Sequence, residues 1–175
     1  MESFDVIHHI CVMKTLKHLL TMTLIVSAGL FTANAQSKND KKASKEADIR
    51  AKVEHKHYTF LANYVLPLRG GAHALTETYY DLKVTSDSVK SFLPYFGRAY
   101  FDIPYNPTEG GIKFTSTKFD YSVKERRKGG WEITIAPKDV KNIERLVLNI
   151  SPDGYASLAV TSINRDFITY DVNLK

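Results

Sequence analysis

The feature that most constrains the fold is a two-residue alternation of apolar side chains that begins at Tyr58 and recurs to the end of the chain. The first such run places five side chains on one face of an extended segment: Tyr58, Phe60, Ala62, Tyr64 and Leu66. Similar runs occupy residues 79–85, 131–135, 145–150, 156–160 and 168–174. A period of two is typical of strands that bury one face. The chain is therefore predicted to be mostly β, with about seven or more strands.

Short turns separate these runs. Ser151-Pro152-Asp153-Gly154 is a strong turn signal, and Gly129-Gly130 and Asn164-Arg165-Asp166 punctuate the chain in the same way. Strands joined by short turns pair as antiparallel neighbours, and no spacing typical of a parallel sheet is present. We expect an antiparallel meander, strongly curved or barrel-like, with one N-terminal helix. The alternative is an α+β fold with the helix packed on an antiparallel sheet.

Residues 112–123 do not fit one straight strand. Ile112 and Phe114 share one parity, whereas Phe119, Tyr121 and Val123 share the other. Either a bulge near residues 116–118 resets the phase, or the strand bends between two packing surfaces. From Ile112 onward we expect one continuous antiparallel sheet.

A helix is predicted over residues 41–57, after a flexible tether from residue 36. The segment is rich in Lys, Ala and Glu and lacks Gly and Pro. Three charged pairs are spaced to meet on a helix surface: Lys42–Glu46, Glu46–Arg50 and Asp48–Lys52. Ile49, Val53 and His57 are four residues apart and predict a narrow apolar face. The single β domain then spans residues 58–175.

Residues 1–35 read as a cleavable secretory signal. Lys14 and Lys17 precede an uncharged apolar stretch over residues 19–31, and the small residues Ala33 and Ala35 suit cleavage after Ala35. The apolar stretch is shorter than the roughly 20 residues that a membrane span needs. The protein is therefore expected to be exported, periplasmic or secreted.

Two residues sharpen the interpretation of this leader. Met13 begins a conventional signal, so it is the expected start of translation. The only cysteine is Cys11, far before the predicted first mature residue, Gln36. The mature chain should therefore lack disulfides, thiol catalysis and a lipid or other stable membrane anchor.

The sequence contains no nucleophile-elbow, phosphate-loop or zinc-protease motif. His55 and His57 are expected to be exposed at the junction of helix and strand rather than to bind a metal. The formal charge of +5 is modest and partly local, and export argues against a nucleic-acid partner. No catalytic residue, metal or cofactor is predicted.

Four carboxylates could in principle pair as acid and base: Asp81, Asp102, Asp120 and Asp171. Such a pair would suit a glycan-acting hydrolase. Each is more simply interpreted as a solvent-facing strand or loop residue.

The most distinctive segment is residues 93–105, which combines five aromatic residues with breakers at Pro94, Gly97 and Pro104. It is predicted to form a loop that either closes an open end of the sheet or presents a binding surface. Aromatic rings beside an arginine suit stacking against sugars or peptides. The candidate ligand-binding residues are Tyr95, Phe96, Arg98, Tyr100 and Tyr105.

This segment also carries a resemblance. Residues 93–100 (LPYFGRAY), followed by Ile112-Lys113-Phe114, Gly130-Trp131, Gly154-Tyr155-Ala156 and Asn164-Arg165, resemble domain-of-unknown-function family 4251. The resemblance implies a bacterial envelope or secreted protein. It implies no activity and no site residue.

The resulting hypothesis is a non-enzymatic, exported module that binds a small molecule, a glycan or an envelope protein. The alternatives are the hydrolase with paired carboxylates and an interaction module that pairs through an exposed sheet edge.

Overall fold

The computed structural model describes residues 40–102, 110–127 and 129–175. The predicted signal and its cleavage site lie outside these ranges, as does Tyr105. The chain divides into two compact units, residues 1–44 and Lys45–Lys175, and the fold below is that of the second. No helix in the described ranges is long and apolar enough to cross a membrane.

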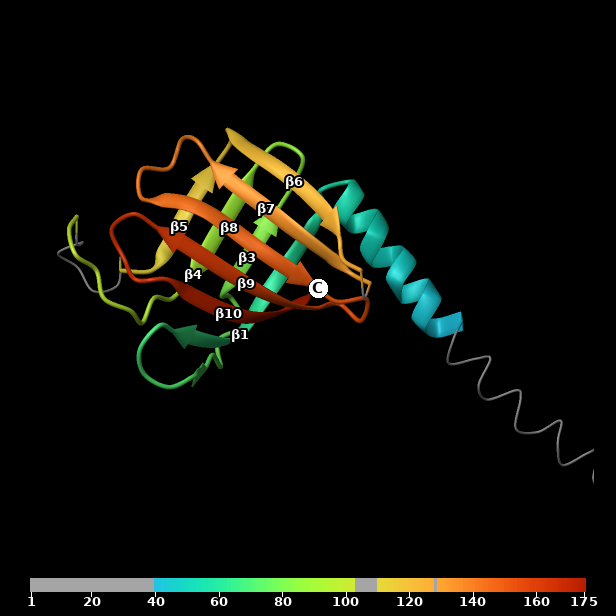
Figure 1. Ribbon diagram of the computed structural model, residues 1–175, viewed down its shortest axis with the longest axis horizontal. Helices are drawn as coiled ribbons and strands as arrows, with labels where there is room; N and C mark the ends of the chain where they lie inside the picture. The colour runs from blue at the N-terminus through green and yellow to red at the C-terminus, as the bar shows by residue number, and fades with distance from the viewer. Residues whose placement is uncertain (1–39, 103–109, 128) are drawn as a thin grey trace, which may run out of the picture. The chain divides into compact units, whose positions relative to one another are not determined.

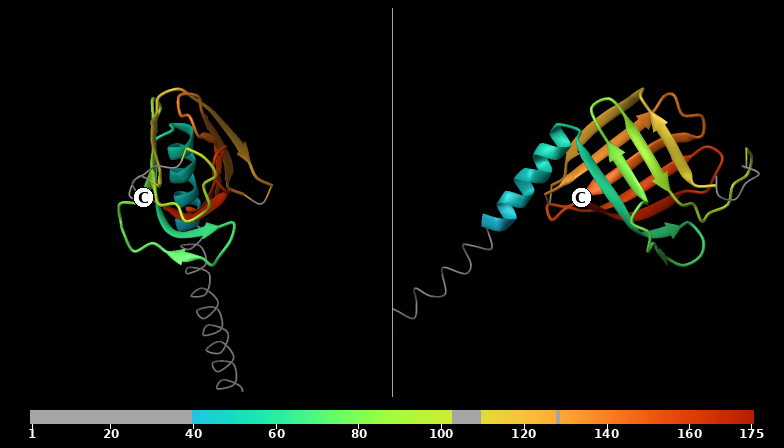
Figure 2. Two further views of the ribbon diagram at one scale, coloured as in Figure 1. Left: turned by 90° about the vertical axis from the view of Figure 1, so that its left-hand side faces the viewer. Right: turned by 180° about the vertical axis from the view of Figure 1, so that it is seen from behind.

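The second unit is mostly β, as predicted, and its described residues form ten strands. They are β1 (Tyr58–Pro67), β2 (His73–Ala74), β3 (Asp81–Val84), β4 (Val89–Leu93), β5 (Ile112–Ser116), β6 (Phe119–Glu125), β7 (Trp131–Pro137), β8 (Ile143–Ile150), β9 (Tyr155–Ser162) and β10 (Ile168–Leu174). Their order in the sheet is β5-β4-β3-β1-β10-β9-β8-β7-β6, and β2 pairs β1. Every pairing is antiparallel. Seen from one end, the strands curve into a nearly closed barrel (Figure 1, Figure 2).

The prediction of one continuous sheet from Ile112 onward is wrong for β5. Strands β6 to β10 do form a meander, but β5 pairs with β4 at the opposite end of the sheet order. Residues 112–123 therefore belong to two strands with different neighbours, β4 for β5 and β7 for β6. This explains why the apolar side chains change parity between them. The break falls at Thr117 and Lys118, where the expected phase reset lies.

Asp139, in the loop that follows β7, binds the residues at the break between β5 and β6. Its carboxylate accepts hydrogen bonds from the Ser116 hydroxyl, from the Thr117 amide at 2.9 Å and from the Lys118 amide at 3.2 Å. These donors, the Ser116 hydroxyl foremost, lower the pKa of Asp139 to about 2. The carboxylate thus joins β5 and β6 where the strand ladder stops.

A second correction concerns β1. Tyr58, Phe60 and Ala62 are buried as predicted, but Tyr64 and Leu66 are exposed. The register with β10 shifts between Ala62 and Tyr64, which marks a β-bulge. One extra residue reverses the side-chain alternation, so Val65, at 0% exposure, replaces Tyr64 in the core.

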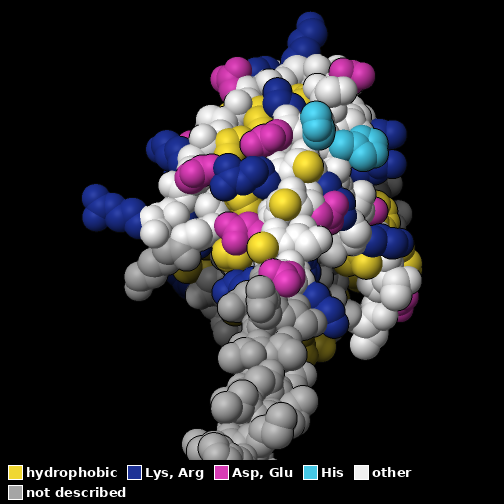
Figure 3. Space-filling model, turned by 90° about the vertical axis from the view of Figure 1, so that its right-hand side faces the viewer, with side chains coloured by type: hydrophobic (Ala, Val, Ile, Leu, Met, Phe, Trp, Pro, Cys, Tyr) yellow, Lys and Arg dark blue, Asp and Glu magenta, His cyan; other side chains and the backbone are white. Residues whose placement is uncertain are grey.

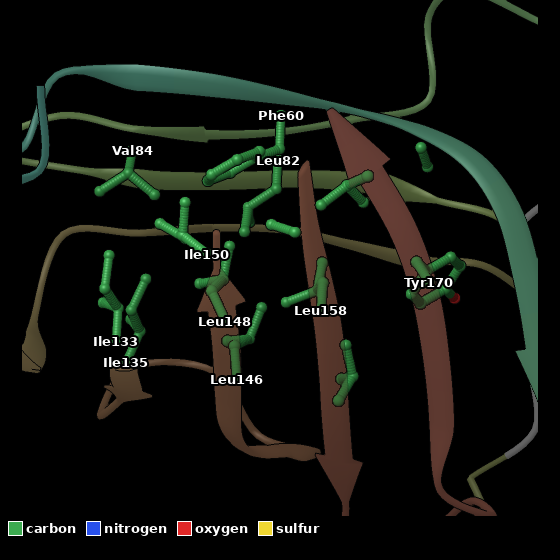
Figure 4. Packing of buried hydrophobic residues seen from close by; sticks show 14 of the residues in the cluster. Phe60, Leu82, Val84, Ile133, Ile135, Leu146, Leu148, Ile150, Leu158 and Tyr170 are labelled. Atoms are coloured by element: carbon green, nitrogen blue, oxygen red, sulfur yellow. The ribbon is translucent and has the colours of Figure 1, made fainter. Parts of the chain in front are cut away.

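The core lies between the two halves of the barrel. Figure 4 shows Phe60, Leu82 and Val84 facing side chains from β7, β8 and β9. Those opposite include Ile133, Ile135, Leu146, Leu148, Ile150 and Leu158, all fully buried. Alternate residues of most strands supply this core, which confirms the periodicity that predicted them, whereas β2 and β6 contribute no fully buried side chain.

A helix precedes β1 and spans residues 40–54, three residues short of the predicted end. Ile49 and Val53 are buried, whereas His57 lies beyond the helix and is exposed. The Tyr121 hydroxyl donates to the Val53 carbonyl at 3.2 Å, and the Arg50 guanidinium lies 5.6 Å from the centre of the Trp131 ring. The helical residues 45–54 therefore cover the end of the barrel where β7 begins.

Charge is mixed on the face that Figure 3 shows, where Lys and Arg side chains are interspersed with Asp and Glu. Arg50 pairs with Glu125 at 2.7 Å, and Lys52 pairs with Asp48 at 3.0 Å as predicted. Arg50 therefore pairs with a residue of β6 rather than with Glu46, the partner that its helical spacing predicted.

Candidate functional site

The segment that follows β4 crosses to the turn between β9 and β10. Ala99 and Arg165 form an isolated antiparallel bridge. The Asp166 amide donates to the Arg98 carbonyl, and the Tyr100 amide donates to the Asn164 carbonyl, both at 2.9 Å. The loop predicted from its breakers is thus fixed to a turn more than sixty residues away.

Two buried side chains of the turn strengthen this attachment. Asn164 has 0% exposure, and its amide nitrogen donates to the Phe101 carbonyl at 3.0 Å. Asp166, 9% exposed, accepts a hydrogen bond from the Tyr100 hydroxyl. These bonds hold Tyr100 and Phe101 against the turn, whereas the buried Asn164 amide oxygen has no hydrogen-bond partner among the described residues.

Tyr95 points into the attachment rather than toward solvent. Its hydroxyl lies 2.9 Å from the Arg98 carbonyl oxygen and 3.0 Å from the Asp166 carbonyl oxygen. The Arg165 guanidinium lies 5.2 Å from the centre of its ring. Burial, with the negative charge of Asp166, raises the pKa of Tyr95 to about 12. Tyr95 therefore holds the loop together and is not free to contact a ligand through its hydroxyl.

The first residues of the segment belong to the core. Leu93 is fully buried, and the Tyr170 hydroxyl donates to the Pro94 carbonyl at 2.6 Å. Tyr170 itself has 0% exposure. Leu93 and Pro94 therefore pack against the core. The core-plug interpretation expected Tyr95, Phe96 and Tyr100 to close the end of the sheet, but Phe96 and Tyr100 are exposed.

Three aromatic side chains between residues 96 and 101 face outward. Phe96, Tyr100 and Phe101 are 48%, 60% and 54% exposed, and the Phe96 ring stacks on His73 with 5.1 Å between centroids. Two apolar residues that flank the β9–β10 turn are also exposed, Ile163 and Phe167. We call the following six exposed residues the aromatic rim: Phe96, Arg98, Tyr100, Phe101, Ile163 and Phe167.

The structure thus divides the sequence-based candidates. Phe96, Arg98 and Tyr100 are exposed at one end of the barrel, whereas Tyr95 supports them from within. Ile163 and Phe167 were not among the candidates, because each is a single apolar residue beside a turn. Their exposure becomes visible only when the turn is seen to meet the loop.

The four carboxylates lie on separate elements. Asp102 pairs with Lys141 at 3.0 Å and accepts from Asn142, which lowers its pKa, and Asp120 pairs with Lys138 at 2.8 Å. Asp81 begins β3, and Asp171 lies in β10 opposite Ser157. No hydrogen bond joins any two of the four in the described part of the chain.

His55 and His57 are exposed between the helix and β1, as expected. Within the described ranges, no group of three or more His, Cys, Asp or Glu side chains is arranged to hold a metal ion.

The family model of DUF4251, a domain of unknown function, matches residues 40–174. The chain belongs to the DUF4251 family. The crystal structure of a DUF4251 family protein from Bacteroides eggerthii is similar, with a TM-score of 0.54 and 16% identity over 75% of this chain and 87% of that one. This likeness is one of fold. No curated protein matches the chain.

Proposed function

We propose that this DUF4251 protein is an exported, non-enzymatic module of the cell envelope that binds a protein partner through the aromatic rim. The observation that carries the proposal is the contrast between the backbone and the side chains of the loop. The backbone is fixed to the β9–β10 turn by paired, largely buried groups, while Phe96, Tyr100 and Phe101 are about half exposed or more.

Such an arrangement lowers the cost of binding. A loop that is already ordered loses little conformational entropy when a partner docks, so more of the contact energy appears as affinity. Aromatic residues and arginine are also the residue types that dominate protein interfaces. A loop that served only to close the barrel would gain nothing from three outward-facing rings.

The exposure of these rings favours a protein over a small molecule. A small-molecule site is concave and surrounds most of its ligand. Phe96, Tyr100 and Phe101 instead stand out from the surface, where they suit a broad apolar contact.

Two further observations support the remaining parts of the proposal. The secretory leader in residues 1–35 supports export, and its loss leaves no cysteine for thiol chemistry. Asp102 pairs with Lys141 and Asp120 pairs with Lys138, so neither is held beside a second candidate carboxylate as the acid-and-base pair of a glycosidase requires. We therefore do not favour the glycan-hydrolase alternative.

The test compares the partner proteins captured by wild type, by a variant of the aromatic rim and by a control variant outside the rim. Tagged wild-type protein, the double variant Phe96→Ala/Phe101→Ala and the control Tyr79→Ala are expressed in the native cell and crosslinked in the envelope. Phe101 is chosen because only its backbone carbonyl takes part in the attachment of loop to turn. Tyr79 is an aromatic residue of similar exposure, 54%, outside the rim. We expect the same crosslinked proteins with wild type and control, and their loss with the rim variant.

Equal melting temperatures of the three proteins establish that all are folded. Identical capture by all three would refute the rim as the binding surface. Capture that is lost instead on substituting the edge strand β6 would favour the sheet-edge alternative.

A further inference from the structure

A row of polar and aromatic side chains crosses the outer face of the barrel on β8, β9, β10 and β1, which lie side by side (Figure 1). The strand register makes Asn149 the neighbour of Ser157, Ser157 the neighbour of Asp171, and Asp171 the neighbour of Tyr64. Tyr155 and Asn173 are paired in the next outward-facing row. The residues therefore form a continuous surface perpendicular to the strands.

This surface is hollowed into a groove of about 550 Å³. Tyr64 and Tyr155 border it and are 50% and 66% exposed. Amide, hydroxyl and carboxylate groups complete its lining: Asn63, Asn149, Ser157, Asp171 and Asn173. Four neighbouring strands span three inter-strand spacings, roughly 14 Å, so the groove is long enough for several linked sugar rings.

The bulge in β1 creates one side of the groove. Strict alternation from Phe60 would turn Tyr64 into the core, and the register shift between Ala62 and Tyr64 turns it outward instead. The same shift places Asn63 among the lining residues. Bulges occur disproportionately beside functional sites, where they redirect a side chain. Here the redirected side chain is a large aromatic residue exposed to solvent.

The chemistry of the lining residues selects a ligand class. Asparagine amides both donate and accept hydrogen bonds, and a carboxylate such as that of Asp171 can accept from two adjacent hydroxyl groups of a ligand. Tyrosine rings offer flat apolar faces with a polar tip. Among the described residues that line the groove, none is Lys or Arg. A ligand rich in hydroxyl groups, with apolar ring faces and no negative charge, fits this set.

We propose that the groove bordered by Tyr64 and Tyr155 binds a neutral oligosaccharide. The tyrosine rings stack on sugar rings, and Asn149, Ser157 and Asp171 bond to their hydroxyl groups. This site lies on strand faces that the aromatic rim does not include, so it stands or falls independently of the proposed protein partner.

Isothermal titration calorimetry of the mature chain tests the proposal with three neutral probes, maltohexaose, cellohexaose and mannohexaose, and one anionic probe, hexagalacturonate. At least one neutral probe should bind. Tyr64→Ala and Tyr155→Ala should each weaken that binding at least about tenfold. Asp171→Asn should weaken it in the same direction. The matched control Tyr79→Ala, an exposed tyrosine outside the groove, should bind like wild type.

Tyr64 and Tyr155 are both at least half exposed, so their replacement should leave the melting temperature unchanged. The proposal is overturned if no neutral probe binds at millimolar concentration, or if hexagalacturonate alone binds. It is also overturned if the folded Tyr64→Ala and Tyr155→Ala variants bind a neutral probe as well as wild type does.

Discussion

Removal of one buried hydroxyl should reveal how firmly the barrel end is held. In Tyr170→Phe, the ring still fills its place in the core (Figure 4), but the Pro94 carbonyl loses the donor that lies 2.6 Å away. A buried acceptor left without its partner costs about 1–2 kcal/mol. Unfolding entropy of about 2.1 cal/mol/K per residue over roughly 130 residues converts this to a melting temperature lower by about 4–7 °C.

The assay is thermal unfolding at neutral pH, with amide hydrogen exchange at Tyr100 and Asp166 as the local measurement. Both amides donate across the contact between loop and turn, so their exchange should accelerate more than that of the central strands. Tyr155→Phe, which changes a residue 66% exposed, should stay within about 0.5 kcal/mol of wild type. A Tyr170→Phe melting temperature equal to that of this control would refute the reasoning.

Three further perturbations test other parts of the fold. Gly130→Ala should cost at least about 2 kcal/mol in denaturant unfolding, because φ is 82° there and a Cβ would collide with the Ile150 carbonyl oxygen. Burial raises the pKa of Tyr58 and Tyr170 above 10.0, so stability should be complete below about pH 10 and fall above it, by up to about 1.4 kcal/mol per pH unit for each tyrosine. The lowered pKa of Asp139 means that its stabilisation is present above its ordinary value of 3.8 and lost toward pH 2. Asp139→Asn should therefore lower the melting temperature at pH 7 and show a smaller further decrease between pH 5 and pH 2.

Each of these three predictions has a control variant or a reference profile. Gly70→Ala also places a side chain at positive φ, but nothing lies within 4 Å of its Cβ, so its cost should be only about 1 kcal/mol. In alkali, Tyr170→Phe should remove one of the two contributions and make the pH dependence shallower. An Asp139→Asn variant with the wild-type acid profile would show that the carboxylate does not hold the break between β5 and β6.

Local pattern predicted the strands well because each one buries alternate side chains. Leu146, Leu148 and Ile150 are on one parity in the sequence and are fully buried in β8. The turn Ser151–Gly154 was also predicted correctly, because Gly154 takes the positive φ of 81° that the turn requires.

Features of the fold that depend on residues distant in the sequence could not be predicted from local pattern. The bulge in β1 is defined by its register with β10, more than a hundred residues later, so Tyr64 was assigned to the wrong face. Strand β4 was missed because its alternation, over Val89, Ser91 and Leu93, places a serine at a buried position. That serine is tolerated because its hydroxyl donates to the Ile112 carbonyl of β5 at 2.9 Å.

The candidate site shows the same division. Composition singled out residues 93–105 and placed Phe96, Arg98 and Tyr100 among the candidates. It could not separate Tyr95 from them, because only the fold reveals that the Tyr95 hydroxyl lies against the carbonyls of Arg98 and Asp166. The groove on the outer face was not foreseen at all, since its residues come from four strands in three separate parts of the sequence.

The central claim, that the aromatic rim contacts a protein, is tested most directly by photocrosslinking in the native cell. A photoreactive phenylalanine derivative is placed in turn at Phe96, Phe101 and Tyr79. The account predicts one shared crosslinked protein from positions 96 and 101, both in the rim, and none of that species from position 79. Equal crosslinking from all three positions, or none from either rim position, would contradict it.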